Sequence, residues 1–291
     1  MSRETGLALY GRTASLASAP VIRRYSNSFR LATALFPRRC RAAVGSIYAL
    51  VRVADEIVDG TADEAGLGRA EIAQRLDELE AETERAIATG FSANLVVHAF
   101  AVVARETGIA AEPIRAFFAS MRRDLDIVAF DEAEYRTYIH GSAEAVGLMC
   151  LRVFLHGHDV APDELRELES GAARLGAAFQ KVNFLRDLGH DASRLGRGYL
   201  PGVAPTGMTE AAKAEIVADI RADLEAARRA TAGLPRDCRR AVRVAAGIFG
   251  ELLRRIDRLP AERLASVRVS VPASTKVVIA VRCSLLRGSG A

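Results

Sequence analysis

The sequence has 291 residues, half of them hydrophobic, with four widely spaced cysteines and a formal net charge of +4. No apolar run reaches the ~18 residues that a transmembrane helix needs, and residues 1–20 lack the apolar centre of a secretory signal. Without a CxxC pair the cysteines predict neither a zinc site nor a disulfide framework, so the reducing cytoplasm is the expected location.

The chain is predicted to be a flexible N-terminal arm followed by one all-helical domain. Residues 1–20 are small and polar and are expected to form the arm, and residues 21–291 form the domain. Strand-like alternation occurs only over residues 267–271, which is too short to imply a sheet. Apolar periodicity and break residues predict helices over residues 21–36, 38–59, 69–89, 92–107, 112–127, 131–155, 162–170, 171–191, 209–231, 235–259 and 272–286. The predicted fold class is therefore all-α, with many helices packed around a core.

A polar stripe interrupts the predicted helix 38–59. Its members are Tyr48, Arg52, Asp55 and Asp59. On a helix of 3.6 residues per turn they fall within an arc of about 60°. An acidic pair at this spacing is usually a solvated helix face, but Arg52 and Glu56 are the only other charged residues over positions 42–58. A stripe on so apolar a helix is expected to face a polar site, because burying unpaired charge is costly.

A second stripe occupies the predicted helix 171–191. Its members are Gln180, Asn183, Asp187 and Asp191. They recur at steps of three, four and four and span about 80° on a helix. A polar network that only stabilises the fold is the alternative interpretation. Because an arginine accompanies each stripe, Arg52 within the first and Arg186 beside the second, the two together favour a binding site.

The residue types in the two stripes suit a metal–diphosphate site. Mg²⁺ prefers oxygen ligands and is often held by a few carboxylates together with substrate phosphate oxygens. The predicted ligands of Mg²⁺, with Mn²⁺ as the alternative ion, are Asp55, Asp59, Asn183, Asp187 and Asp191. Arg52 and Arg186 are expected to bind phosphate directly, because guanidinium groups match its oxygens. An apolar cavity beside them would exclude water from a carbocation.

The two motifs carry a family resemblance. The patterns Tyr-x-x-x-Arg-x-x-Asp-Glu-x-x-Asp at 48–59 and Gln-x-x-Asn-x-x-Arg-Asp-x-x-x-Asp at 180–191 resemble those of the squalene/phytoene synthase family, and the resemblance runs from about residue 25 to about residue 282. It implies the isoprenoid-synthase helical bundle around a central cavity. It also implies Mg²⁺-dependent, head-to-head joining of two prenyl diphosphates through a cyclopropyl intermediate. No Gly-rich dinucleotide loop is found, so no nicotinamide cofactor is expected.

The resemblance assigns roles to individual residues. It places Asp55, Asp59, Asp187, Tyr138 and Arg52 in catalysis. It places Tyr25, Ser26, Ser28, Tyr48, Arg52, Gln180 and Arg186 at substrate-contacting positions. The small residues Gly141, Ala145 and Gly147 either let a polyprenyl tail pass close to their helix or serve close helix packing.

The sequence departs from the family pattern at two positions. His190 stands where an acid is usual and either faces solvent beside the site or takes part in catalysis. Phe249 stands where relatives often carry tyrosine, so a hydroxyl contact near the diphosphate is absent. Arg268 and Lys276 either reach a phosphate or lie on the surface.

The end of the sequence favours one activity within the family. The stretch Arg268 to Pro272, followed by Lys276, is similar to the end of bacterial phytoene synthases. The expected reaction is therefore the condensation of two geranylgeranyl diphosphates to phytoene through prephytoene diphosphate, in carotenoid biosynthesis. The alternatives are a dehydrosqualene, presqualene diphosphate or squalene synthase that uses farnesyl diphosphate, and a non-catalytic member of the fold. Because the acids of both motifs are intact, the non-catalytic alternative is disfavoured.

The charge distribution suggests a membrane partner. Residues 221–291 contain fifteen Lys/Arg and six Asp/Glu, an excess of nine against a total of +4, which leaves residues 1–220 at −5. Such a tail suits nucleic acid, an anionic membrane or a phosphorylated substrate, or is simply a solvated helix surface. Phe249 is its only aromatic residue, so nucleic acid is not expected. Since the product is apolar, peripheral docking at the inner face of the cell membrane is predicted.

Overall fold

The computed structural model describes residues 5–25, 27–126, 130–190, 199–203 and 207–285, and within these ranges it contains helices and no strand. The long helices are α1 (Gly6–Tyr25), α3 (Arg38–Val58), α5 (Arg69–Thr89), α6 (Leu95–Thr107), α7 (Ala111–Arg123), α9 (Ala145–Leu155), α10 (Pro162–His190), α11 (Glu210–Ala230), α12 (Arg236–Asp257) and α13 (Ala273–Leu285). The short ones are α2 (Asn27–Ala34), α4 (Thr61–Glu64) and α8 (Glu132–Ile139). The all-α prediction is confirmed, and no described helix is long and apolar enough to cross a bilayer.

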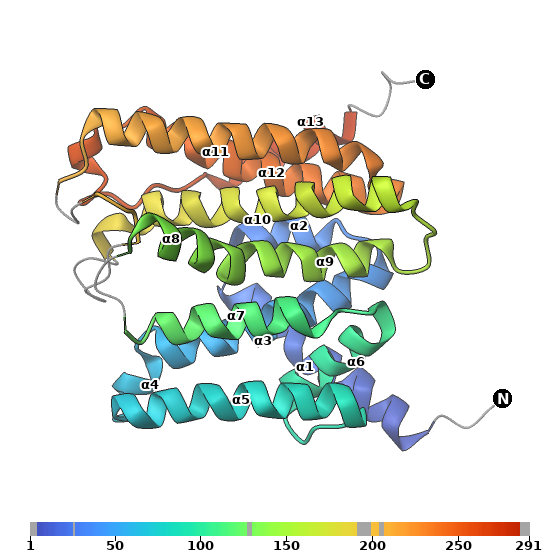
Figure 1. Cartoon of the computed structure of the whole chain (residues 1–291). Helices are drawn as coiled ribbons and strands as arrows, with labels where there is room; N and C mark the ends of the chain where they lie inside the picture. Colours follow the sequence, from blue (N-terminus) through green and yellow to red (C-terminus); the bar gives the residue numbers. More distant parts are fainter. Residues whose placement is uncertain (1–4, 26, 127–129, 191–198, 204–206, 286–291) are drawn as a thin grey trace.

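The helices stack in layers. Figure 1 shows α5 at one side of the bundle, then α3 and α7, then α9 and α10, with α11, α12 and α13 at the opposite side. Helix α3 packs against α1, α6 and α9, and α10 packs against α9, α11 and α12. Helices α3 and α10, which carry the two polar stripes, are therefore inner helices of the bundle.

Local signals explain where several helices begin and end. Helix α3 is followed by Gly60, whose φ of +101° is the left-handed conformation that glycine adopts without strain. Helix α8 begins with a capping box, in which Asp131 Oδ1 accepts from Glu134 N–H (2.8 Å) and Glu134 Oε2 accepts from Asp131 N–H (3.1 Å). Helix α6 begins at Asn94, whose side chain accepts from the Val96 amide at 3.0 Å.

The prediction of a loose arm over residues 1–20 is wrong from Gly6 onward. Helix α1 packs against α3 and α6 and buries Ala14 and Ser18 completely. Small side chains at these positions let α1 approach its neighbours closely. The Tyr10 hydroxyl donates to the Ser92 carbonyl at 3.1 Å. The composition of this segment, rich in small residues, therefore reflects close packing rather than disorder.

Two helix boundaries also differ from the prediction. Residues 162–170 and 171–191 were predicted as separate helices, but α10 runs unbroken from Pro162 to His190. Gly171 lies inside this helix. A Cβ at this position would be only 2.1 Å from the Cβ of Ala230 in α11. This glycine permits close contact with α11 instead of ending a helix. The predicted helix 21–36 is divided between the end of α1 and α2.

Gly141 and Gly147 both serve close helix packing, and Gly147 also lines the cavity described below. A Cβ on Gly141 would lie 2.1 Å from the carbonyl oxygen of Ala116 in α7, and one on Gly147 would lie 2.5 Å from that of Ala172 in α10. Ala145, between them, is completely buried. Gly141 belongs to a π-helical turn (His140–Glu144) that joins α8 to α9. Gly141 thus holds the π-helical turn against α7, and Gly147 holds α9 against α10, both at backbone distance.

His98 makes stability sensitive to acid. Its side chain is fully buried beside Tyr10, and burial lowers its pKa from 6.5. As the pH falls below about 6.5, the unfolded chain gains a proton that the folded state resists, so the free energy of unfolding should fall, by at most about 1.4 kcal/mol per pH unit from this group. Urea unfolding between pH 7.5 and 5.5 should show a shallower pH dependence for His98→Phe than for the parent protein. Parallel pH dependences in the two proteins would contradict this role.

Candidate active site

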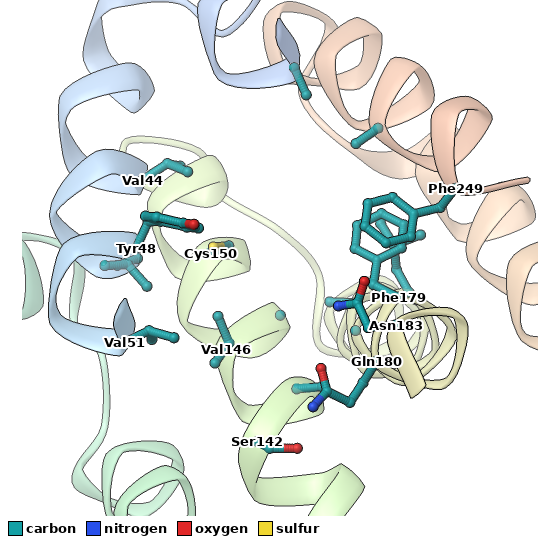
Figure 2. Close-up of a pocket in the computed structure, with 18 of the residues that line it drawn as sticks. Val44, Tyr48, Val51, Ser142, Val146, Cys150, Phe179, Gln180, Asn183 and Phe249 are labelled. Atoms are coloured by element: carbon teal, nitrogen blue, oxygen red, sulfur yellow. The ribbon is translucent and has the colours of Figure 1, made fainter. Parts of the chain in front are cut away.

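A cavity of ≈ 850 Å³ lies between the two inner helices. Figure 2 shows Tyr48 and Val51 of α3 on one side, Gln180 and Asn183 of α10 on the other, and α9 with Val146 behind them. The two predicted stripes thus meet at one cavity. The predicted site residues that line it are Tyr25, Tyr48, Arg52, Asp55, Asp59, Tyr138, Gln180, Asn183, Arg186 and Asp187.

The cavity has a polar end and an apolar end. The acids lie near the C-terminal ends of α3 and α10, where Asp55, Asp59 and Asp187 line the wall. Toward the opposite ends of these helices the lining is apolar, with members that include Phe36, Val44, Phe154, Leu168, Leu234 and Val242. Along α10, Leu168 and Asp187 are separated by nineteen residues, or about 28 Å of helix. The site therefore suits a molecule with a charged head and a long apolar tail.

Arg52 organises the first stripe. Its Nε donates to Glu56 Oε1 at 2.8 Å, and its guanidinium lies 3.8 Å from Asp55 and 4.7 Å above the Tyr25 ring. Burial raises the pKa of Asp55 well above its usual value, and the nearby charge of Asp59 raises it further. The α3 stripe thus holds excess negative charge that a cation in the cavity would relieve.

Asp187 in the second stripe has the opposite electrostatics. Arg186 Nε donates to its two oxygens at 3.0 and 3.1 Å, and Arg268 Nε donates to Oδ1 at 2.8 Å. Burial alone would raise the pKa of Asp187, but the two arginines lower it below its usual value. Arg268 therefore reaches the site instead of serving only the surface, and Lys276 also lines the cavity. Arg186 and Arg268 can exchange their contacts with Asp187 for contacts with an anion that enters the cavity.

The donor set fits the predicted metal. Asn183 Oδ1 is buried and has no hydrogen-bond partner, although buried acceptors are normally paired. Within the described part of the chain no three acids, histidines or cysteines form a group that holds an ion by itself. Oxygen donors on two separate helices match Mg²⁺, which is completed by waters and phosphate oxygens. Asp55 and Asp59 would bind on one side, and Asn183 and Asp187 on the other.

A buried carboxylate that sequence reasoning missed joins two tyrosines. Asp124, at the end of α7, accepts from the hydroxyl of Tyr138 at 2.8 Å and from that of Tyr199 at 2.9 Å. Asp124 is only 5% exposed and lines the cavity, and its charge contributes to the raised pKa of Asp55. It belongs to no acidic stripe, so no local pattern marks it. Its role depends on tyrosines fourteen and seventy-five residues away.

Two phenylalanines form part of the wall between α10 and α12. The rings of Phe179 and Phe249 are stacked with centroids 3.9 Å apart (Figure 2). Phe249 is 3% exposed, and it lines the cavity together with Phe179. Stacking on Phe249 therefore fixes the orientation of the Phe179 ring in the cavity wall.

Some predicted site residues cannot be compared with the structure. Ser26 and Asp191 lie outside the described residues, as do the side chains of Ser28 and His190. The catalytic, substrate-binding and metal-binding roles assigned from the sequence stay predictions. The structure adds that every described member of the set lines the same cavity.

Solved structures define the class of fold. A dehydrosqualene synthase determined in complex with a ligand superposes with a TM-score of 0.78 at 22% identity, over 98% of this chain and 100% of its own. A squalene synthase from Alicyclobacillus acidocaldarius gives 0.71 at 20% identity, over 87% and 97% of the two chains. With its helical bundle and cavity, the protein has the isoprenoid-synthase helical fold.

Sequence comparison defines the family. The model of the squalene/phytoene synthase family matches residues 22–275. The chain is 34% identical to phytoene synthase 3 of Zea mays over 62% of its length, and 27% identical to a bifunctional lycopene cyclase/phytoene synthase of Colletotrichum graminicola over 90%. It spans 41% and 50% of those two proteins. The chain belongs to the squalene/phytoene synthase family.

Proposed function

We propose that the protein is a prenyltransferase that condenses two geranylgeranyl diphosphates head to head into phytoene, through prephytoene diphosphate, for carotenoid biosynthesis. The observation that carries the proposal is the pair of charged stripes that meet at one end of an otherwise apolar cavity. The names of its relatives in Zea mays and Arthrospira platensis, both phytoene synthases at 34% and 32% identity, support the choice of product.

The charged residues at the polar end would bind the diphosphates. When bound, Mg²⁺ would neutralise the diphosphate and make it a better leaving group. Arg52, Arg186, Arg268 and Lys276 supply the remaining positive charge from this chain. Arg186 and Arg268 are held against Asp187, and thus near the end of α10 where a phosphate would arrive. The expected result is fixed orientation of two headgroups whose tails run toward the apolar end.

The apolar and aromatic residues would then control the carbocations. Breaking the first C–O bond releases diphosphate and leaves an allylic cation, which the double bond of the second substrate attacks, with loss of a proton, to form the cyclopropyl diphosphate. A second ionisation, rearrangement and proton loss give the product without a reductant. The apolar lining excludes water that would quench each cation. Tyr138 and Phe179 line the cavity, and their rings can stabilise positive charge.

A farnesyl diphosphate-dependent activity is the second candidate. The two solved structures described above are named as dehydrosqualene and squalene synthases. Their identity to this chain, 22% and 20%, supports the fold and not the choice of substrate. The sequence relatives therefore favour the longer substrate.

Product analysis tests the proposal. Purified protein with Mg²⁺ should convert geranylgeranyl diphosphate to a C40 hydrocarbon and should convert farnesyl diphosphate poorly. EDTA should abolish product, and added Mg²⁺ or Mn²⁺ should restore it. A C30 product from farnesyl diphosphate alone would replace the proposal with the second candidate. Absence of product from both substrates, with a normal circular dichroism spectrum, would overturn both.

A further inference from the structure

One face of α12 carries four arginines, of which Arg236 is exposed and the other three are half-buried. Arg239 donates to the Leu234 carbonyl at 2.8 Å, and Arg240 Nε is buried without a hydrogen-bond partner. Arg236, Arg239, Arg240 and Arg243, here called the arginine stripe, fall within an arc of about 100° on one face of the helix. Asp237 is the acid in the first turn, and it is paired with Arg39 at 2.8 Å. Across the part of the chain that the structure describes, no carboxylate forms an ion pair with any member of the stripe.

In the absence of a bound anion, the arginine stripe should lower the stability of the folded protein. It begins at the first residue of α12, where the helix dipole is positive and repels cations. Burial lowers the pKa of Arg239, and the charges of Arg243 and Arg236 lower it further. Repulsion of this kind costs stability unless an anion from outside the chain relieves it.

Helix α13 places an apolar face beside this stripe. Its inner side packs on α12, where Ile279 Cγ2 lies 2.8 Å from the position of a Cβ on Gly247 and Cys283 Sγ donates to the Arg243 carbonyl at 3.8 Å. The opposite side, here called the valine face, consists of Val277, Val278 and Val281, which are 56%, 55% and 51% exposed. Arg282 follows on the same side of the helix and is exposed. Figure 1 shows α13 at the edge of the bundle beside α12.

We infer that α13 and the N-terminal half of α12 dock the protein on an anionic lipid surface, with the valine face inserted at the headgroup boundary and the arginine stripe and Arg282 on the headgroups. Small exposed apolar side chains flanked by cations suit this partner. A second protein chain fits less well, because interface cores are depleted of charge and rich in aromatics. Three valines are also far short of the roughly 800 Å² that each partner buries in a stable interface.

The same helices wall the cavity. Val242 and Ala245 of α12 and Lys276 of α13 line it from the inside. Val242 belongs to the hydrophobic cluster of the apolar end, together with Phe36, Phe154 and Leu168. Docking through this surface would bring the outer wall of the apolar end next to lipid, where an apolar molecule can be exchanged without crossing water.

Vesicle co-sedimentation of the full chain tests the inference. The parent protein should sediment at low salt with vesicles of phosphatidylcholine and phosphatidylglycerol, and should stay in solution with phosphatidylcholine alone. The triple variant Arg236→Gln, Arg243→Gln and Arg282→Gln should bind about a hundredfold more weakly, since each arginine near an anionic surface contributes about fivefold. Replacing Val277, Val278 and Val281 by serine should weaken binding at least about tenfold.

Matched controls separate this surface from net charge. The variant Arg69→Gln, Arg75→Gln and Arg85→Gln removes three exposed arginines from α5, on the opposite side of the bundle, and should bind like the parent (Figure 1). Equal weakening in this control, unchanged binding in both docking-surface variants, or no sedimentation of the parent protein would overturn the inference. If the serine variant instead changes the oligomeric state by gel filtration and leaves vesicle binding intact, the valine face binds a second copy and the inference is wrong. Circular dichroism melting establishes that each variant is folded.

The vesicle assay measures no product, so its outcome is independent of the proposed reaction. A protein that makes no hydrocarbon but sediments as described keeps the docking surface and loses the proposed activity. A protein that makes the C40 product but does not bind anionic vesicles keeps the proposed activity and loses the docking surface.

Discussion

Asp55→Asn should lower kcat by about a thousandfold while leaving the fold intact. Asp55 lies in the stripe where excess negative charge faces the cavity, and losing one electrostatic anchor of a leaving group typically costs this much. The measurement is hydrocarbon formation from the preferred prenyl diphosphate at saturating Mg²⁺. The matched control Asp63→Asn changes an exposed acid of α4 and should leave kcat unchanged.

The same substitution should raise or preserve thermal stability in EDTA. Because burial and Asp59 raise the pKa of Asp55, the ionised carboxylate is disfavoured in the folded state at neutral pH. Asparagine keeps the size of the side chain and removes the charge, so the melting temperature without metal should not fall. A variant that is both inactive and strongly destabilised would show that Asp55 serves the fold rather than the site.

Gly141→Ala should destabilise the protein by about 2–3 kcal/mol, as overpacking of a tight contact commonly does. The new Cβ would lie 2.1 Å from the Ala116 carbonyl oxygen and 2.2 Å from Ser120 Oγ, so α7 and the π-helical turn must separate. Ser120 Oγ also donates to the Tyr138 carbonyl at 3.3 Å, and this hydrogen bond should weaken when α7 and the turn separate. The expected fall in melting temperature is roughly 5 °C or more.

Gly250→Ala provides the control for this effect. Gly250 lies in α12 with open space where the Cβ would be placed, so alanine should stabilise its helix by about 0.5–1 kcal/mol. Calorimetry of the two variants should thus give shifts of opposite sign. A melting temperature of Gly141→Ala equal to that of the parent would mean that the π-helical turn is not held against α7 at backbone distance.

Asp124 illustrates why part of the site escaped prediction. The two stripes repeat at helical spacing, so one helix places each set on one face, and the sequence alone shows it. Asp124 has no such repeat, and it joins the site because it follows α7 and accepts from the hydroxyls of Tyr138 in α8 and of Tyr199. Side chains assembled from separate elements leave no periodic signal in the sequence.

The prediction for the N-terminal segment was wrong for a related physical reason. Small polar residues predict disorder when considered locally, because they bury little apolar surface. In the fold, Ala14 and Ser18 are valuable because they are small, since α1 packs closely on α3 and α6. Likewise, Gly171 resembles a helix break in the sequence but allows α10 and α11 to touch.

By itself the sequence determined the all-α class, most helix boundaries, and the two stripes with their charges, because hydrophobic periodicity and caps are local properties of the chain. Only the tertiary structure decided that Arg268 contacts Asp187, that Asp124 joins Tyr138 to Tyr199, and that Cys40 and Cys238 bring their sulfur atoms to 3.4 Å across 198 residues. These relations depend on how helices pack, which is governed by shape complementarity between distant side chains. No spacing within a single helix encodes that complementarity.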